Sequence, residues 1–412
     1  MINSTVLSKV DRIILEKEIP VGRRFRLLLL GTPIYSQTEQ SFLDGLVRTL
    51  TPLASALLVI AGNYRPRADT RARIVNVRFN TAKSSSLGRS LQFLSEQIAV
   101  SRALIGHVSS YEYIVVHAGE YRNIIPILVS KLMRKKILIH HFGGDKFVEA
   151  KLEAQSRLSK FFLPYVQWFA LLIVYRLVDV ILVEAFATVE WGRLTKFRGK
   201  IATPIHPEGL EGCIDLAGES RRNLICFIGR LVAKRDLTPV INAIPTIMLS
   251  FPDTTLIIVG RGPLLDRYRN LVVSLDLHDH LKLLPYVADL QGLYQEAKLL
   301  VFPSVEEGIP HVVIEAMCNG VIVVASPVGA IPEIVRPGKT GFFLQKLDTA
   351  GVASSVIEAL SANSLSDVAR EAQRLVISRY GFEITVKKYQ DIFQRLAEPR
   401  LPLSDHSYFY RW

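Results

Sequence analysis

The stretch KLLVFPSVEEGIPHVVIEAMCNG, residues 298–320, predicts a buried strand, a polar loop and a helix. Its first five residues form a continuous apolar run, which is typical of strands covered on both faces in parallel sheets. Pro310 suits the first turn of a helix, and Gly320 suits the position just past the end. We therefore expect a helix over about 310–318 whose N-terminus faces the carboxyl edge of a sheet, where open α/β folds bind ligands.

Similar apolar runs recur in two series, with segments of helical length between them. The first series is RLLLL (26–30), ALLVIA (56–61), YIVVH (113–117), KILIH (136–140) and DVILV (179–183). The second is LICFI (224–228), TLIIVG (255–260), LKLLPY (281–286), KLLVF (298–302) and VIVVA (321–325). Residues 204–220, rich in Pro and Gly, read as a linker between two α/β domains. Residues 381–396 should form a helix that docks by one apolar face, which consists of Phe382, Val386, Tyr389 and Phe393.

The composition points to a folded protein with an anionic partner. Of 412 residues, 49% are hydrophobic, and Lys plus Arg exceed Asp plus Glu by 50 to 38. Nucleic acid is disfavoured as that partner, because the basic residues are dispersed rather than clustered with aromatic ones. The three cysteines, Cys213, Cys226 and Cys318, fit no disulfide framework and no CxxC metal spacing, so we expect a reducing compartment. The first 20 residues lack a signal-peptide core, which predicts a cytoplasmic location.

One apolar stretch, FFLPYVQWFALLIVY at 161–175, is too short to span a bilayer as a helix. It is either a helix buried in a domain core or a helix that lies in a membrane interface, helped by Trp168, Arg157 and Lys160. The second alternative, together with the positive charge, suggests that the N-terminal domain rests on the anionic inner face of the plasma membrane.

Glu307 and Glu315 flank the predicted helix N-terminus. Two carboxylates cannot both bind a phosphate, because they would repel it, but they can accept hydrogen bonds from hydroxyl groups. A sugar nucleotide carries a ribose on one side of its diphosphate and a hexose on the other, so one glutamate would bind each sugar. The alternative is that both are ordinary acids of the kind favoured near a helix start.

Cations and turn-rich loops accompany the two glutamates. FIGRLVAKRD (227–236) places Gly229 and Arg230 directly after a strand, with Lys234 and Arg235 a turn later, where they can converge on a phosphate. ASPVGAIPEIVRPGKTGFF (325–343) adds backbone N–H donors after another strand. Taken singly, such an arginine is usually a solvated loop charge.

Together, the GRL segment, VGRGPL (259–264), VFPSVEEGIPHVVIEAM and SPVGAIPEIVRPGKTGF resemble the donor-binding half of retaining glycosyltransferases of the GT-B fold, specifically glycosyltransferase family 4. The resemblance runs from about 224 to 345, and its E-x7-E signature is Glu307 to Glu315. HHFGGD (140–145) and YRLVDVILVEA are similar to the family more loosely. The resemblance implies two Rossmann-like domains facing each other across a cleft, at 1–207 and 208–380. A C-terminal helix and tail, 381–412, would return toward the first domain.

The resemblance also implies roles for residues. Glu315 would hold the ribose and Glu307 would lie against the transferred sugar, while Arg230 and either Lys234 or Arg235 would neutralise the diphosphate. His141, or its neighbour His140, would contact the donor sugar. The remaining expected donor-binding residues are Gly229, Gly260, Gly308, Ile309, Pro310 and His311, and those on the acceptor side are His140, Asp145, Gly31 and Thr32.

Three departures from the family pattern stand out. Arg235 occupies the usual lysine column and is followed by Asp236 where a glycine is common. Ala330 replaces the second glycine of a usual pair, and GTPIYSQTEQ (31–40) replaces a Gly-Gly loop.

The sequence thus predicts a retaining hexosyltransferase that moves a sugar from a nucleotide-diphosphate donor to a hydroxyl acceptor, a glycan or a lipid-linked glycan of the cell envelope. No D-x-D motif occurs, so we expect no metal and no cofactor. Two alternatives stay open. One is a sugar-nucleotide epimerase or hydrolase of the same fold, and the other is a non-catalytic, sugar-nucleotide-binding membrane scaffold.

Overall fold

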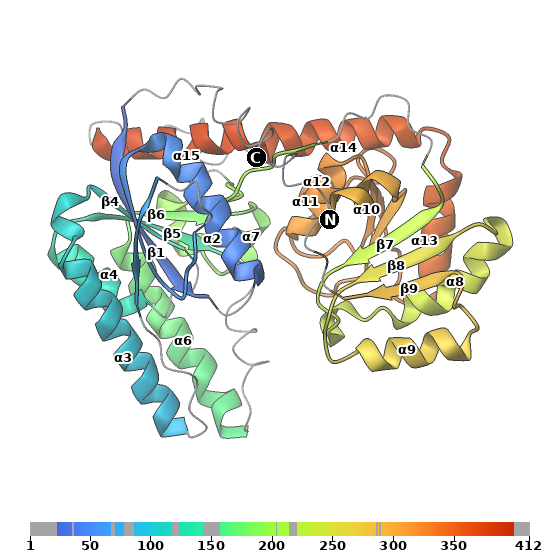
Figure 1. Cartoon of the computed structure of the whole chain (residues 1–412), viewed down its shortest axis with the longest axis horizontal. Coiled ribbons are helices and arrows are strands. Elements are labelled where there is room, and N and C mark those ends of the chain that lie inside the picture. Colours follow the sequence, from blue (N-terminus) through green and yellow to red (C-terminus); the bar gives the residue numbers. More distant parts are fainter. Residues whose placement is uncertain are drawn as a thin grey trace, which may run out of the picture.

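The computed structural model describes residues 23–34, 37–66, 71–77, 86–117, 123–142, 157–202, 204–213, 221–285, 287 and 290–398. These residues form two α/β domains, each built around a six-stranded parallel sheet (Figure 1). Both sheets have the doubly wound strand order, β3-β2-β1-β4-β5-β6 in the first and β12-β11-β10-β7-β8-β9 in the second. Asp145 and the chain beyond Glu398 lie outside the described residues.

The first sheet consists of β1 (Phe25–Pro33), β2 (Ala54–Gly62), β3 (Arg73–Asn76), β4 (Tyr113–Val116), β5 (Lys136–His141) and β6 (Val180–Val183). Its helices are α2 (Gln37–Leu50), α3 (Ser86–Ile105), α4 (Ile124–Leu132), α6 (Arg157–Leu177) and α7 (Ala187–Trp191). Leu27 and Leu29 of β1 face a core shared with α2, whereas Leu28 and Leu30 face a core shared with α3, α4 and α6. The apolar runs are continuous because both faces of the sheet are covered.

The second sheet consists of β7 (Leu224–Ile228), β8 (Thr255–Val259), β9 (Leu281–Leu284), β10 (Leu299–Phe302), β11 (Ile322–Ala325) and β12 (Phe342–Phe343). Its helices are α8 (Thr238–Ser250), α9 (Leu265–Ser274), α10 (Gln291–Glu296), α11 (His311–Cys318), α12 (Ile331–Ile334), α13 (Thr349–Ser361) and α14 (Leu365–Tyr380). All ten predicted strands are present. The patterns miss β3 and β12, because these are short edge strands, of four and two residues.

The last helix, α15 (Phe382–Ala397), crosses back to the first domain, and α14 and α15 together span both domains in Figure 1. Val386, Tyr389 and Phe393 are buried in the first domain's core with Phe382 packed against it, which confirms the predicted docking face. The two segments that connect the domains also pair with each other. The Leu210 N–H donates to the Tyr380 carbonyl at 2.7 Å, and the Phe382 N–H donates to the Leu210 carbonyl at 3.0 Å.

The cysteine prediction is wrong, because Cys213 and Cys318 form a disulfide with a Cα–Cα distance of 5.0 Å. The two residues are 105 positions apart, so their spacing carried no signal. They meet because residues 204–213 of the linker run past the C-terminal end of α11. Cys226 is a buried free thiol in β7, and burial raises its pKa to about 12.

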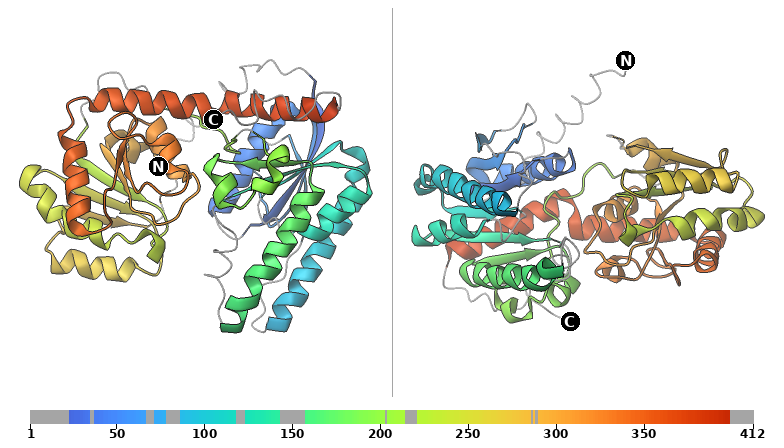
Figure 2. Two further views of the ribbon diagram at one scale, coloured as in Figure 1. Left: turned by 180° about the vertical axis from the view of Figure 1, so that it is seen from behind. Right: turned by 90° about the horizontal axis from the view of Figure 1, so that it is seen from below.

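Helix α6 is buried on one side and exposed on the other. Leu171, Val174 and Tyr175 are buried, whereas Tyr165, Val166 and Phe169 are between 59% and 65% exposed. Figures 1 and 2 show that α3 and α6 project well beyond the sheet on which they pack. In the described part of the chain, no helix is both long enough and apolar enough to cross a bilayer.

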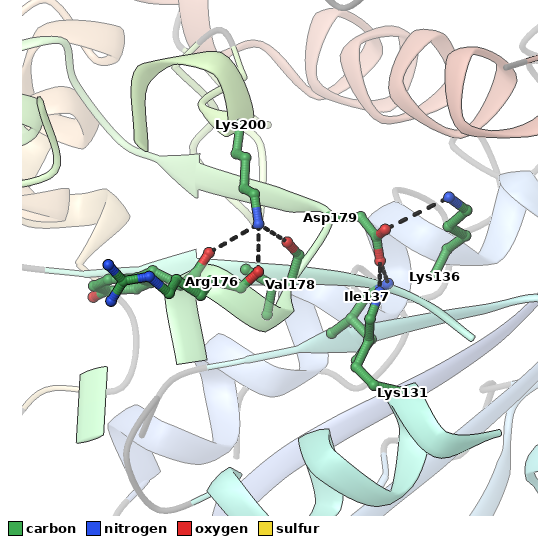
Figure 3. Close-up of polar contacts among 8 residues, drawn as sticks. Lys131, Lys136, Ile137, Arg176, Val178, Asp179 and Lys200 are labelled. Atoms are coloured by element: carbon green, nitrogen blue, oxygen red, sulfur yellow. Dashed lines mark hydrogen bonds and ion pairs between the residues drawn. The ribbon is translucent and has the colours of Figure 1, made fainter. Parts of the chain in front are cut away.

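Polar contacts fix the end of α6 against the sheet (Figure 3). The Lys200 ammonium donates to the carbonyls of Tyr175, Arg176 and Val178, at 3.2, 2.6 and 2.8 Å. Asp179, which follows α6, accepts from the Ile137 N–H at 2.8 Å and pairs with Lys131 and Lys136 at 2.9 and 3.6 Å. These contacts satisfy the C-terminal carbonyls of α6 and hold the projecting helix at a fixed angle to β5 and β6.

Candidate active site

The predicted donor-side segments meet at one edge of the second sheet. β7 and β10 are neighbours at the point where the strand order reverses, and both end at the same edge because the sheet is parallel. Residues 229–235 follow β7 and residues 303–310 follow β10. The crevice beside such a switch point is the usual ligand site of open α/β sheets.

Arg235 and Glu307 form a buried ion pair across this edge. Arg235 Nε lies 2.5 Å from Glu307 Oε1, and the two side chains are 15% and 7% exposed. The same carboxylate oxygen accepts from the Ser304 hydroxyl at 2.7 Å, and the Arg235 guanidinium lies 5.0 Å from the centre of the Phe302 ring. Arg230, in contrast, is exposed. Of the two candidates for the lysine role, Arg235 pairs with Glu307 and Lys234 is half-buried beside it.

Glycines allow the loops at this edge to touch through their backbones. A Cβ on Gly260, after β8, would lie 1.9 Å from the Gly229 carbonyl oxygen. A Cβ on Gly329, after β11, would lie 1.7 Å from the carbonyl oxygen of Glu307, and Gly329 has a φ of +56°. No side chain fits either position, so these glycines determine how closely the loops approach. Ala330, which replaces the family's second glycine, is buried at the N-cap of α12.

Helix α11 begins one residue later than predicted, at His311. Pro310 has an extended backbone with ψ of 125° and serves as the N-cap. The predicted end holds, because Cys318 is the last helical residue and Gly320 has a φ of +70°. Gly308 and Ile309 precede the helix, and Ile309 is buried in the core. The free N–H groups of the first turn are available to an anion at this edge.

Glu315 lies one turn along α11 and opens on a pocket of about 290 Å³. Its Oε1 is 3.3 Å from His311 Nδ1, and its Oε2 accepts from the Tyr294 hydroxyl at 3.0 Å. The pocket is also lined by Arg48 of α2 and by Glu208 of the linker, so both domains contribute to it.

His311 connects α11 with the linker and with the first domain. Its Nε2 is 3.4 Å from Glu208 Oε2, and its ring packs edge-on against Phe42 of α2 and His206 of the linker. Burial lowers the pKa of His311, but Glu315 and Glu208 outweigh burial and the pKa is raised. Burial raises the pKa of Glu208, and burial together with His311 lowers that of His206.

The N-terminal candidates lie deeper than predicted. His141 Nδ1 is 2.6 Å from the Tyr175 hydroxyl, and His140 Nε2 is 2.6 Å from the Tyr389 hydroxyl of α15. Both rings are at most 2% exposed, and neither lines the pocket described above. The region predicted as a 31–40 loop is partly regular, since β1 continues through Gly31 and Thr32 to Pro33 and α2 begins at Gln37.

Sequence reasoning missed several residues of this region. His117 directly follows β4, which neighbours β1 at the switch point of the first sheet, and its ring contacts those of His140 and Phe142. The position of His117 after a predicted strand was the available signal. No local pattern pointed to Glu208 or Tyr294, which reach the pocket only through the tertiary fold.

Comparison with known proteins places the strongest similarity in the second domain. Residues 215–376 match the family model described as Glycosyl transferases group 1. A stretch of 142 residues is 30% identical to N-acetyl-alpha-D-glucosaminyl L-malate synthase of Bacillus anthracis and covers 34% of this chain and 37% of that protein. A stretch of 231 residues is 28% identical to an exopolysaccharide phosphotransferase of Streptomyces coelicolor and covers 54% and 24% of the two chains. The chain thus matches well under half the length of these relatives.

Solved structures resemble the whole molecule. The Anabaena protein Alr3699/HepE in complex with UDP-glucose superposes with a TM-score of 0.68 at 16% identity, and covers 91% of this chain and 100% of its own. Sucrose-phosphate synthase from Thermosynechococcus elongatus gives 0.68 at 15% identity, with the same coverage of both chains. The fold is GT-B. Both predicted Rossmann-like domains and the returning helix are present.

Proposed function

We propose that this protein is a retaining glycosyltransferase of glycosyltransferase family 4, which moves a sugar from a nucleotide-diphosphate donor to a hydroxyl acceptor. The observation that carries the proposal is that the loop after β7, which holds Arg230 and Lys234, the loop after β10, which holds Glu307, and the α11 N-terminus all follow strands that end at the switch point of the second sheet. Similarity to the group 1 family model over 215–376 and a fold shared with a UDP-glucose complex support a nucleotide-sugar donor. We keep the proposed domain limits of 1–207, 208–380 and 381–412.

Each site residue has a chemical role in this proposal. Arg230, Lys234 and the first N–H groups of α11 stabilise the diphosphate as it departs from an oxocarbenium-like centre. Glu315 accepts hydrogen bonds from the ribose and Glu307 from the transferred sugar, while Arg235 holds Glu307 in place. The acceptor attacks from the same face and the departing phosphate oxygen takes its proton, so no protein nucleophile and no metal is needed.

The acceptor side belongs to the first domain. His140, His141, Asp145, Gly31 and Thr32 keep their predicted acceptor-side and donor-sugar roles, and the buried histidines would act on substrate through a local rearrangement. The acceptor we propose is a glycan or lipid-linked glycan of the cell envelope. We further propose that this protein acts on it at the inner face of the plasma membrane.

The first test is nucleotide binding. UDP, GDP, ADP and their common sugars are added to the wild type in a thermal-shift assay, because a ligand that binds only the native state raises the midpoint by mass action. Glu315→Ala should abolish the shift, whereas Glu358→Ala, an exposed glutamate on α13, should leave it unchanged. If no nucleotide shifts the wild type at millimolar concentration, the enzyme proposal fails, and so does any alternative that binds a sugar nucleotide.

Turnover then separates the remaining alternatives. Release of nucleotide should require an acceptor and should survive EDTA, and Arg230→Ala should lower kcat by on the order of 10²- to 10³-fold, the usual loss for one electrostatic contact. Rapid conversion of the donor without acceptor would instead indicate an epimerase or hydrolase. Inversion at the anomeric carbon of the product would refute the retaining mechanism.

A further inference from the structure

The net positive charge of this protein comes from its first half. Residues 1–207 carry 29 Lys and Arg against 15 Asp and Glu, whereas residues 208–412 carry 21 against 23. The proposed donor site is in the second half, so the excess charge is not explained by binding of a nucleotide diphosphate. Charge asymmetry of this kind indicates a separate anionic partner for the first domain.

The first domain also exposes an apolar surface. Helices α3, α4 and α6 cover one face of the first sheet and share one core. Half of the exposed large hydrophobic residues in the described part of the chain lie on these three helices. They include Leu94 and Ile98 on α3, Leu132 on α4, and Tyr165, Val166 and Phe169 on α6.

The α6 residues form a single stripe. Tyr165, Val166 and Phe169 follow helical spacing on one side, and the residues that pack into the core, including Leu171 and Val174, lie on the opposite side. Arg176 continues the exposed stripe toward the end of the helix. A helix with aromatic and aliphatic side chains on one free face and basic residues nearby suits the interface of a membrane, where aromatic rings sit at headgroup level.

We propose that the outer surface of α3, α4 and α6 docks the first domain onto an anionic lipid surface. Aromatic and aliphatic side chains of α6 enter the headgroup region, and the net positive charge of the domain supplies the long-range attraction. The Lys200 and Asp179 contacts tie the C-terminal end of α6 to the first domain, so the helix is part of the folded domain before it binds (Figure 3). This extends the proposed function, because a membrane-held acceptor would meet the domain assigned to acceptor binding.

Two other occupants fit the surface less well. A second copy would bring two positively charged halves together, which costs free energy at low salt. A nucleic acid would satisfy the charge but not the apolar stripe of α6, since phosphate contacts use basic and polar groups. An anionic lipid surface satisfies both features together.

The test is sedimentation of the full chain with vesicles, without any sugar donor. Vesicles of phosphatidylcholine with phosphatidylglycerol should bind the wild type at low salt, and pure phosphatidylcholine vesicles should bind it far less. The triple variant Tyr165→Ser, Val166→Ser, Phe169→Ser should bind the anionic vesicles on the order of 10- to 100-fold more weakly, because three exposed apolar side chains no longer insert. The matched control, Leu249→Ser with Val273→Ser, removes side chains that are 85% and 64% exposed on the second domain and should bind like the wild type.

Three outcomes would overturn the proposal. The first is that the wild type does not bind anionic vesicles at low salt. The second is that the triple variant binds these vesicles as strongly as the wild type. The third is that light scattering shows a change of oligomeric state in the triple variant but not in the control variant. The last would assign the surface to a second copy. The nucleotide thermal shift of the triple variant serves as a folding check and should match the wild type. The thermal shift also separates membrane docking from the proposed enzymatic function. Vesicle binding can fail while nucleotide binding is retained, and nucleotide binding can fail while vesicle binding is retained.

Discussion

Replacing Arg235 with methionine should destabilise the second domain by about 3–5 kcal/mol. Methionine keeps the length and apolar contacts of the arginine stem, so the lost group is the guanidinium that lies 2.5 Å from Glu307 Oε1. The Glu307 side chain is only 7% exposed, and its carboxylate would remain buried beside the Ser304 hydroxyl. The cost comes from this uncompensated charge, which is largely removed from water.

The chain supplies a matched surface pair. Arg269 Nη1 lies 2.8 Å from Asp266 Oδ1 on α9, but these side chains are 62% and 87% exposed. Arg269→Met should therefore cost less than about 1 kcal/mol, because solvent screens the pair. At roughly 2–4 °C for each kcal/mol, Arg235→Met should lower the Tm by roughly 6–20 °C and Arg269→Met by less than about 4 °C.

Thermal unfolding followed by circular dichroism measures both variants under the same conditions. Adding Glu307→Gln to Arg235→Met should recover part of the lost stability, because the neutral amide no longer buries a charge. Equal Tm values for the two single variants would refute the view that Arg235 and Glu307 form a buried pair. So would a double variant less stable than the sum of its single changes predicts.

Three further outcomes are expected. Cys213→Ser, or reduction of the bond to Cys318, should lower the free energy of unfolding by about 2–4 kcal/mol, because the disulfide closes a long loop. Mass spectrometry of the unreduced protein should find one free thiol among the three cysteines, and three free thiols would rule the bond out. The pKa of His311 is raised, so its contribution to stability is complete below about pH 6.5 and is lost as the pH rises through the raised value. The Tm advantage of the wild type over His311→Gln should therefore shrink from about pH 6 to about pH 9, and a constant difference would contradict this. Gly260→Ala should lower the free energy of unfolding by about 1–3 kcal/mol, because the added Cβ would overlap a carbonyl oxygen. At Gly292 in α10 an added Cβ meets no atom within 4 Å, so Gly292→Ala should be neutral or stabilising, and equal effects of the two changes would count against the close loop contact.

Strands and their grouping into two domains were accessible from the sequence because strand signals are local. A continuous apolar run reports burial on both faces of a parallel sheet, whichever neighbours it finally has. The apolar spacing of α15 is also a local signal. It predicts that one face of the helix packs against a domain, but it does not indicate which domain. The edge strand β3 was not predicted, because half of its residues face solvent and its run of apolar residues is correspondingly weak.

The donor-side loops were likewise accessible in part. Glu307 and Glu315 could be placed around a helix N-terminus because proline and glycine mark the helix limits along the chain. The ion pair between Arg235 and Glu307 was not accessible, since Lys234 and Arg235 are adjacent in sequence and only the fold decides which side chain lies at the carboxylate.

What the sequence alone determined was therefore the order of the longer elements and the residue types that each loop presents, which depend on residues close together along the chain. Only the tertiary structure decided the pairings between distant residues: Cys213 with Cys318, Glu208 with His311, and the burial of His141 against Tyr175. It also decided that Tyr165, Val166 and Phe169 of α6 stay exposed, because an apolar helix face is buried only where another element lies against it.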